Sequence, residues 1–297
     1  MTAWGPILTT TDFSGPARRA VDRAARLAQE ADSPLSVMHV RPGETLAELR
    51  RWLGTGHASE SLLAQADRQQ LQQLVDAVSS ARHITAKPVQ ATGSVLDEIR
   101  READALDAAL LVVGARGTGF LRRLVLGSTS ERLLRRTNRP VLVVRQTPHE
   151  PYQRVLLALD FSPWSAQAVA VARRVAPQAR YVLLTAYQVP FGDKLRYAGV
   201  EEATIEHYRV QARAEATQRV NALAAQTGLV PGTWEACVIE GEASQRIVEQ
   251  EQERDCDLVV LGKHGQSATE DLLLGSVTKH VLAEGSADVL VSTVRAP

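Results

Sequence analysis

The chain carries one sequence pattern twice. A shift of 148 residues places residues 6–14 on residues 154–162 and keeps four pairs of glycines in register without a gap. The matched pairs are Gly93 and Gly241, Gly114 and Gly262, Gly117 and Gly265, and Gly127 and Gly275. A repeat of this length predicts two domains of the same fold. We place them at residues 1–146 and 152–297, joined by a polar linker that contains Pro148 and Pro151.

Within each half, short apolar runs alternate with stretches of helical periodicity. The runs of the first half are residues 7–10, 35–40, 84–91, 110–113 and 141–144. The clearest helix follows the first run, where apolar residues recur three and four positions apart after a capping Ser14 and a first-turn Pro16. Its apolar positions are Ala17, Ala20, Val21, Ala24, Leu27 and Ala28. Further helices are expected at residues 59–80, 95–106 and 128–136.

This order of elements predicts an α/β fold. Strands separated by crossover helices form a parallel sheet, so we expect two doubly wound, five-stranded parallel-sheet domains in tandem, with helices on both faces of each sheet. Ligands of such sheets bind beyond the carboxyl ends of the strands, at the point where the strand order reverses.

The composition limits the class of partner. The 34 basic residues equal the 34 acidic residues, so no net positive charge attracts nucleic acid or an anionic membrane. No apolar run approaches the roughly 20 residues of a membrane-spanning helix. The residues after Met1 also lack the pattern of an export signal. We therefore expect a cytoplasmic protein that binds neither nucleic acid nor membrane.

The cysteines and histidines do not form a metal-binding or disulfide pattern. Cys237 and Cys256 are too few for a disulfide framework, and we interpret them as buried single thiols. The seven histidines include no pair at the i, i+4 spacing of a helical metal site, and the chain has no CxxC motif. The sequence therefore predicts no metal site.

The glycines follow strands at a spacing that suits phosphate recognition. In the first half, Gly114 and Gly117 come directly after an apolar run, and Gly127, Ser128 and Thr129 follow after nine more residues. Glycine lets backbone N–H groups approach an anion, and a helix N-terminus adds unpaired donors and the positive end of a dipole. The spacing therefore predicts a phosphate site.

The same glycines also have a structural interpretation. Gly114 and Gly262 would then only end strands, and Gly127 and Gly275 would only turn the chain into helices. The presence of the pattern behind equivalent strands of both halves favours the phosphate interpretation. The cationic side chains that could accompany a phosphate are Arg116 in the first half and Lys263 or His264 in the second.

Two further pairs of residues match at the first and second strands of each half. Asp12 and Asp160 follow the first strand, either beside a ligand crevice or as turn residues that satisfy loop N–H groups. His39 and Tyr187 occupy matching places at the second strand. Because these two rings differ in kind, we expect them to line a pocket or to pack, and not to catalyse a reaction.

The glycine pattern is Gly-x-x-Gly, then nine residues, then Gly-Ser. The first strand ends in Asp-Phe-Ser, and the last strand begins after Pro140. With these features together, the sequence resembles the universal stress protein family. The resemblance occurs twice and covers nearly all 297 residues. It implies a Rossmann-like fold of the adenine nucleotide alpha hydrolase type in each half. Members of the family with this motif bind ATP or a related adenine nucleotide.

The resemblance implies one nucleotide site in each half. In the first half it places Asp12 and the backbone of Val40 at the adenosine end. The residues that it places at the phosphates and ribose are Gly114, Arg116, Gly117, Gly127, Ser128 and Thr129. The matching residues of the second half are Asp160, Gly262, His264, Gly265, Gly275, Ser276 and Val277. Because Gln188 replaces Val40 and His264 replaces Arg116, the second pocket is expected to be weaker or altered.

The resemblance also implies an assembly. Family members pair through their last strands, so we expect intrachain pairing of the two domains and a further homodimer.

Arginines surround the expected phosphate helix and either raise the local anion concentration or form a solvated helix face. They are Arg122, Arg123, Arg132, Arg135, Arg136 and Arg139.

Three classes of function remain. The leading hypothesis is a stress-response or signalling protein that uses ATP, ADP or AMP, with Mg²⁺, as a ligand. The alternatives are a slow ATPase and a ligand-free scaffold for protein partners. The chain has no Gly-x-x-x-x-Gly-Lys-Ser/Thr loop and no obvious second carboxylate for Mg²⁺. We therefore predict no catalytic residues and at most weak hydrolysis.

Overall fold

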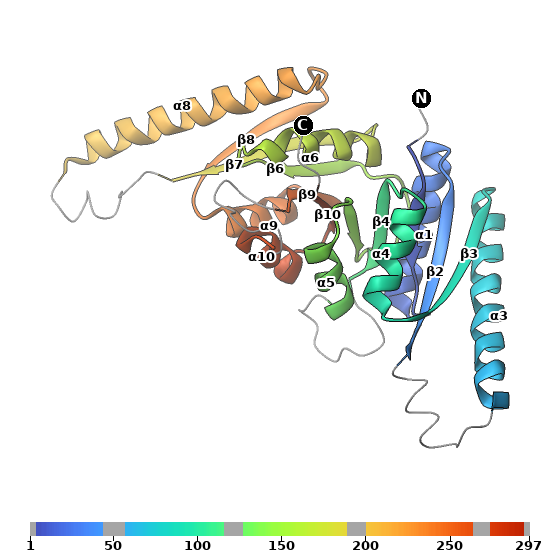
Figure 1. Cartoon of the computed structure of the whole chain (residues 1–297). Coiled ribbons are helices and arrows are strands. Elements are labelled where there is room, and N and C mark those ends of the chain that lie inside the picture. The colour runs from blue at the N-terminus through green and yellow to red at the C-terminus, as the bar shows by residue number, and fades with distance from the viewer. Residues whose placement is uncertain (1–3, 44–56, 116–126, 189–199, 264–273, 294–297) are drawn as a thin grey trace. The chain divides into compact units, whose positions relative to one another are not determined.

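The computed structural model describes residues 4–43, 57–115, 127–188, 200–263 and 274–293. The chain divides into two compact units, Met1–Pro151 and Tyr152–Pro297. Figure 1 shows that each unit combines a twisted sheet with covering helices.

The first unit contains a parallel sheet with the strand order β3-β2-β1-β4-β5. Its strands are β1 (Ile7–Thr10), β2 (Leu35–Pro42), β3 (Ala86–Gly93), β4 (Leu110–Gly114) and β5 (Val141–Val144). Its helices are α1 (Gly15–Ala31), α3 (His57–Arg82), α4 (Val95–Ala105) and α5 (Ser128–Arg136).

The second unit repeats this arrangement, with the strand order β8-β7-β6-β9-β10. Its strands are β6 (Arg154–Ala158), β7 (Arg180–Tyr187), β8 (Trp234–Glu240), β9 (Leu258–Gly262) and β10 (Asp288–Ser292). Its helices are α6 (Pro163–Val175), α8 (Glu202–Gln226), α9 (Ala243–Glu253) and α10 (Ser276–Glu284).

The direction of the crossovers puts helices on both faces of each sheet. In the first unit α1 and α3 carry the chain from β1 outward to β3, and α5 carries it the other way, from β4 to β5. Because parallel crossovers are right-handed, the two directions place their helices on opposite faces. Accordingly, α1 packs beside α3, and α4 packs beside α5. The predicted doubly wound, five-stranded α/β fold in tandem is confirmed.

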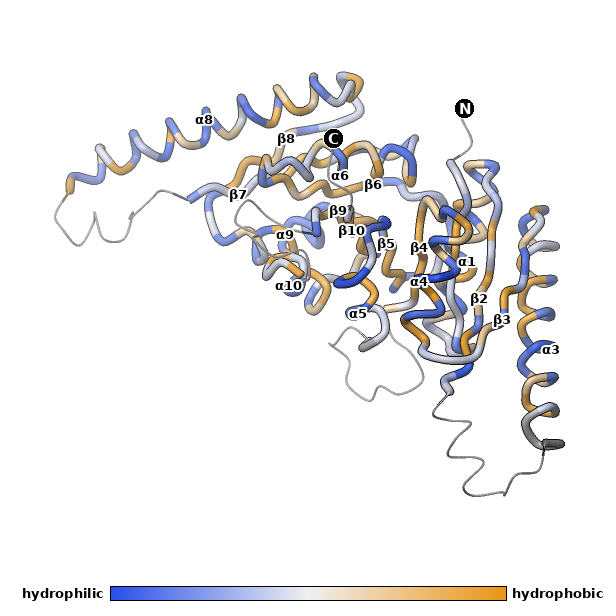
Figure 2. Tube along the Cα trace, viewed as in Figure 1, coloured by the Kyte–Doolittle hydropathy of each residue, from blue (hydrophilic) through white to orange (hydrophobic). Residues whose placement is uncertain are grey.

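The hydropathy pattern explains which faces are buried. Figure 2 shows predominantly apolar central strands and an alternation of polar and apolar positions along α3 and α8. Strands β4 and β5 are buried at every residue, as expected for strands covered on both faces. On α1, all six apolar positions expected from the periodicity are buried.

Helix α1 begins as the sequence predicts and approaches the sheet closely. Ser14 Oγ accepts a hydrogen bond from Ala17 N at 3.3 Å, and Pro16 lies in the first turn. A Cβ atom built on Gly114 would lie 2.9 Å from the backbone carbon and oxygen of Pro16. The end of β4 therefore needs a glycine because the first turn of α1 occupies the space of a side chain.

One strand lies two residues further along than expected. The apolar run 84–91 predicts a strand, but β3 is Ala86–Gly93. Ile84 N donates to Ser79 O, and His83 has a positive φ of 54°. Ile84 therefore takes part in the termination of α3, a role in which an apolar residue often packs back on the last helical turn.

Side chains of α1 bind the end of the first unit. Arg23 Nη1 donates to Glu150 O at 2.9 Å, and Arg26 Nη2 donates to His149 O at 2.6 Å. Burial and the nearby Arg82 lower the pKa of Arg26. Residues 149 and 150, which the sequence assigns to a linker, thus have two backbone carbonyls fixed to a helix.

Both cysteines are buried free thiols, as the sequence predicts. Cys237 Sγ lies 3.4 Å from Gln250 Oε1. Burial raises the pKa of Cys237, and burial raises the pKa of Cys256 to about 12.

The close approach at Gly114 predicts a large effect of one methyl group. We expect Gly114→Ala to lower the free energy of unfolding by about 1–3 kcal/mol, because the new Cβ overlaps backbone that cannot turn away. Gly15→Ala is the matched control, since a Cβ there meets no atom within 4 Å and the position is helical. Urea unfolding followed by circular dichroism measures both. Equal stability of the two variants would contradict the packing explanation.

The thiol environment predicts slow alkylation. In the folded chain at pH 8, iodoacetamide should label neither cysteine, whereas in urea it should label both, because only the exposed thiolate reacts. Mass spectrometry of the labelled chain measures this. The raised pKa of Cys256 also makes the free energy of unfolding depend on pH. The stabilisation from the buried neutral thiol is complete below the unfolded pKa of about 8.5 and is lost as the pH rises toward 12. Labelling of folded Cys256 at the rate of the unfolded chain would disprove the burial argument.

Candidate functional site

The carboxyl ends of β1 and β4 lie where the strand order of the first unit reverses. Strand β1 pairs with β2 on one side and with β4 on the other. Thr11 N, just past β1, donates to Met38 O of β2 at 2.8 Å. Asp12 and Gly114 thus lie at one edge of the sheet, the edge at which doubly wound folds bind ligands.

The chain leaves β4 and returns to the same place at the start of α5. Gly127 N donates to Ala115 O at 2.8 Å, and Ser130 Oγ donates to Gly114 O at 2.8 Å. These two hydrogen bonds bring the first and third glycines of the sequence pattern together, although twelve residues separate them.

The second unit repeats this closure with different side chains. Gly275 N donates to Lys263 O at 3.2 Å, and Thr278 Oγ1 donates to Gly262 O at 3.1 Å. The hydroxyl three residues after the glycine has the same function in both units. Sequence reasoning missed it, although Ser130 and Thr278 match under the shift of 148 residues.

The glycines at these positions serve different purposes. Gly114 is explained by the packing of α1 described above. Gly127 and Gly275 are the N-caps of α5 and α10, with φ of −62° and −56°, which any amino acid adopts. A Cβ on Gly275 would meet Lys263 O at 3.5 Å, an ordinary contact. The described fold therefore does not itself require a glycine at residue 275.

Each of these helices points its N-terminus at the same edge of its sheet. The first N–H groups of an α-helix have no acceptor within the helix, and the helix dipole adds positive potential there. The predicted residues Ser128 and Thr129 lie in the first turn of α5, and Ser276 and Val277 lie in the first turn of α10. Backbone donors at such an end favour an anion.

The two aspartates take part in the turns that follow β1 and β6. Asp12 Oδ1 accepts from Ser14 N at 3.0 Å. Asp160 Oδ1 accepts from Ser162 N at 2.9 Å and from Ser165 Oγ at 3.0 Å. One carboxylate oxygen of each residue thus stabilises its turn, which is the structural role that the sequence left open.

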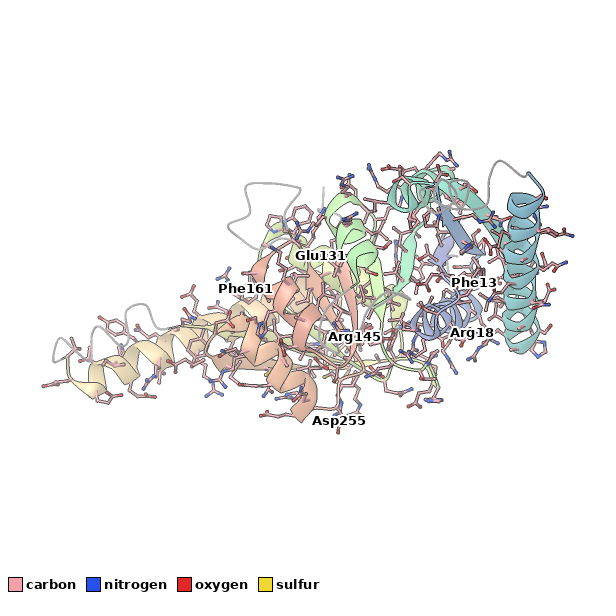
Figure 3. All side chains as sticks on the ribbon, turned by 90° about the horizontal axis from the view of Figure 1, so that it is seen from below. Phe13, Arg18, Glu131, Arg145, Phe161 and Asp255 are labelled. Carbon is pink, nitrogen blue, oxygen red and sulfur yellow. The ribbon has the colours of Figure 1, made fainter. Side chains whose placement is uncertain are left out.

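A strained backbone follows each aspartate. Phe13 has a φ of 64° and Phe161 a φ of 58°, the left-handed region that bulky residues rarely adopt. Figure 3 labels both phenylalanines. Phe13 N donates to Thr11 Oγ1 at 2.9 Å, and the guanidinium of Arg219 lies 4.2 Å from the centre of the Phe161 ring. Strain at the same place in both units is typical of functional turns, and no glycine marks it in the sequence.

The residues at the second strand differ between the units. His39 Nδ1 lies 2.8 Å from Thr11 O, so this ring packs against the turn. Val40, at the adenosine end by family resemblance, is buried, whereas Gln188 at the matching position is exposed. The two edges therefore share a main-chain arrangement and differ in side-chain detail.

The described arginines on and just after α5 lie mainly away from its N-terminus. Arg135 pairs with Glu131, and Arg139 pairs with Asp104 and Asp107. Arg135 and Arg136 occupy the last turn, where positive charge stabilises the negative end of the helix dipole. These contacts favour the solvated-face interpretation for this part of the cluster.

Several predicted positions lie outside the described residues: Arg116, Gly117, Arg122, Arg123, His264 and Gly265. Among the described residues, no three histidine, cysteine or carboxylate side chains gather as a metal site would require. In the same part of the chain, no helix is both long enough and apolar enough to cross a membrane.

Both units match the same protein-family model. The model of the universal stress protein family matches residues 4–145 and matches again over residues 151–293. The chain belongs to the universal stress protein family. The resemblance inferred from the glycine spacing and the Asp-Phe-Ser turns is confirmed.

Individual universal stress proteins match nearly the whole chain. A universal stress protein of Mycolicibacterium smegmatis is 29% identical over 312 residues, which cover 96% of each chain. One from Mycobacterium tuberculosis is 26% identical over 313 residues, covering 97% of this chain and 95% of that protein. The crystal structure of a universal stress protein from Archaeoglobus fulgidus has the same fold, with a TM-score of 0.70, 18% identity and 98% of each chain covered.

The two helix caps predict different effects of one substitution. Ser14→Ala should lower the free energy of unfolding by about 1 kcal/mol, because it removes the acceptor for Ala17 N. Ser162→Ala at the matching cap should leave it unchanged or raise it slightly, since Ser162 Oγ is buried without a hydrogen-bond partner among the described residues. Urea unfolding of the full chain compares them. A larger loss for Ser162→Ala than for Ser14→Ala would contradict these hydrogen-bond assignments.

Proposed function

We propose that this universal stress protein binds ATP, or the related ADP or AMP, with Mg²⁺ at the carboxyl edge of each sheet. The nucleotide acts as a ligand that regulates the protein in the stress response, and the chain catalyses at most slow hydrolysis. Membership of the universal stress protein family supports the stress-response role.

The observation that carries this proposal is Gly275. Its φ is ordinary and a Cβ would fit the described structure, so within the described residues neither backbone strain nor packing explains the glycine. The residue lies at the N-terminus of α10, where backbone N–H groups favour an anion. A phosphate that approaches these N–H groups would explain why a side chain is absent there.

The surrounding residues fit an adenine nucleotide. Phosphates would bind at the first turns of α5 and α10, on Gly127, Ser128 and Thr129 in the first unit. Asp12 and Asp160 would lie toward the adenosine, where each carboxylate already orders its turn through one oxygen. When bound, the nucleotide supplies the negative charge that the helix N-termini attract, and Mg²⁺ would be held mainly by the phosphates.

The first unit is proposed as the tighter site. Val40 is buried near the end of β2, whereas the exposed Gln188 stands at the matching place in the second unit. A buried apolar residue presents a dry surface to an aromatic base, which favours its binding.

The first experiment identifies what the protein binds. Freshly purified chain is denatured, released nucleotide is identified by chromatography and mass spectrometry, and the emptied protein is titrated with ATP and Mg²⁺ by calorimetry. Two equivalents of adenine nucleotide would support both sites, and one would support the first unit alone. No released nucleotide and no binding heat at several temperatures would overturn the proposal.

Substitution of the cap glycines assigns the sites. Gly127→Val should abolish binding in the first unit and Gly275→Val in the second, because a branched side chain would occupy the place of a phosphate oxygen. The φ of each residue suits valine, so both variants should keep the circular dichroism of the parent. Each single variant controls for the other, since it should lose one equivalent of ATP and retain one. A variant that binds ATP with the parent stoichiometry would refute its site.

The remaining expectations for this protein concern its location and assembly. A cytoplasmic location, pairing through the last strands and a homodimer stay predictions. Light scattering of the purified chain measures the last of these.

A further inference from the structure

His39 contacts polar partners at both of its ring nitrogens. Nδ1 lies 2.8 Å from Thr11 O, and Nε2 lies 3.4 Å from Asp67 Oδ2. A carbonyl oxygen only accepts, so Nδ1 carries the hydrogen of the first contact. Nε2 donates to the Asp67 carboxylate in the imidazolium form of the ring, in which both nitrogens carry hydrogen. The side chain is 11% exposed, and its ring orientation is therefore determined by two elements other than its own strand.

The carboxylate that faces His39 is itself bound. Asp67 on α3 accepts from Arg41 Nε at 2.9 Å and also from Arg41 Nη2. His39 and Arg41 are alternate residues of β2 and lie on one face of the strand. The residue between them is Val40, so a single carboxylate fixes both neighbours of the residue expected at the adenosine.

On its other side, His39 contacts the residues that flank Asp12. It binds the carbonyl of Thr11, and its ring lies 4.4 Å from the Phe13 ring, centre to centre. The left-handed backbone of Phe13 is strained, and these contacts favour it. The chain of contacts Arg41, Asp67, His39, Thr11 therefore runs from α3 to the turn that carries Asp12.

In the part of the second unit that the structure describes, the same turn occurs without this chain of contacts. Tyr187 stands at the position of His39, and the Phe161 ring is covered by Arg219 of α8. The backbone of the turn is nevertheless the same, with a φ of 58° at Phe161. Each turn thus serves as an internal reference for the other.

We propose that His39 is a positioning residue for the first nucleotide site. It fixes the turn that presents Asp12 through Thr11 and Phe13, and Asp67 and Arg41 fix His39 in turn. The ligand part of this inference rests on the proposed function, because the Asp12 turn is the adenosine end of that site. His39 determines how tightly the first unit binds the nucleoside and has no contact with the phosphates.

Amide hydrogen exchange in the nucleotide-free full chain tests the positioning. His39→Leu removes both polar contacts and should speed exchange of the Phe13 and Ser14 amides about tenfold, with no change at Phe161 and Ser162. His39→Asn should restore most of the protection, because Asn Nδ2 lies the same number of bonds from Cβ as His Nδ1. Asp67→Asn should give an intermediate rate.

Two results would overturn the positioning role. One is unchanged exchange at Phe13 and Ser14 in His39→Leu. The other is an equal increase in both units, which would indicate general destabilisation. If His39→Leu does not fold, the same comparison between the two turns is made in His39→Asn and Asp67→Asn.

Ligand binding tests the remaining part. In a chain that carries Gly275→Val, so that only the first site reports, His39→Leu should weaken ATP and adenosine by the same factor, about tenfold. A loss confined to ATP, or no loss for either, would contradict the assignment to the nucleoside end. If the parent chain binds neither compound, the proposed function fails, and hydrogen exchange still decides whether His39 fixes the turn.

Discussion

Parallel pairing of strands is the constraint on which this structure depends. Because neighbouring strands run in the same direction, every strand of a unit ends at one edge of the sheet, and every connection must cross a face as a helix. The turns after β1 and β4, far apart in the chain, therefore meet at one place. The backbone bonds Gly127 N to Ala115 O and Gly275 N to Lys263 O then return the chain to that edge. Helix ends, aspartates and glycines gather there as a consequence of topology.

The duplicated glycines illustrate how one residue type serves two physical needs. Gly114 is a packing residue, because the first turn of α1 fills the space of its missing side chain. Gly275 has room for a side chain and an ordinary backbone, so its explanation lies outside the described fold. The sequence offered the structural and the phosphate interpretations as alternatives for all of these positions together. The geometry supports the structural interpretation for Gly114. The phosphate interpretation stays open for the helix caps Gly127 and Gly275.

The fold could be predicted from the sequence because its signals are local and periodic. A short stretch of sequence is enough to recognise each of these signals: the apolar stripe of α1, its Ser14 cap and the buried runs of β4 and β5. The boundary at Ile84 was misplaced because an apolar residue that ends a helix looks like the start of a strand. The contacts of His39 with Thr11 and Asp67 span 28 residues in each direction, and no periodicity encodes them. The left-handed Phe13 and Phe161 gave no signal either, since a glycine or asparagine usually marks such a conformation.

The strained phenylalanine turn has a consequence for the order of folding during synthesis. The groups that hold Phe13 in its left-handed conformation include His39 and, through Thr11, the carbonyl of Met38, all on or next to β2. A nascent chain that has emerged from the ribosome only as far as α1 lacks these groups and keeps the bond from Phe13 N to Thr11 Oγ1 to offset the strained dihedral. Strand β2 must emerge and pair before the turn closes. The Asp12 edge is thus completed only after residues beyond the helix that follows it in the sequence have been synthesised.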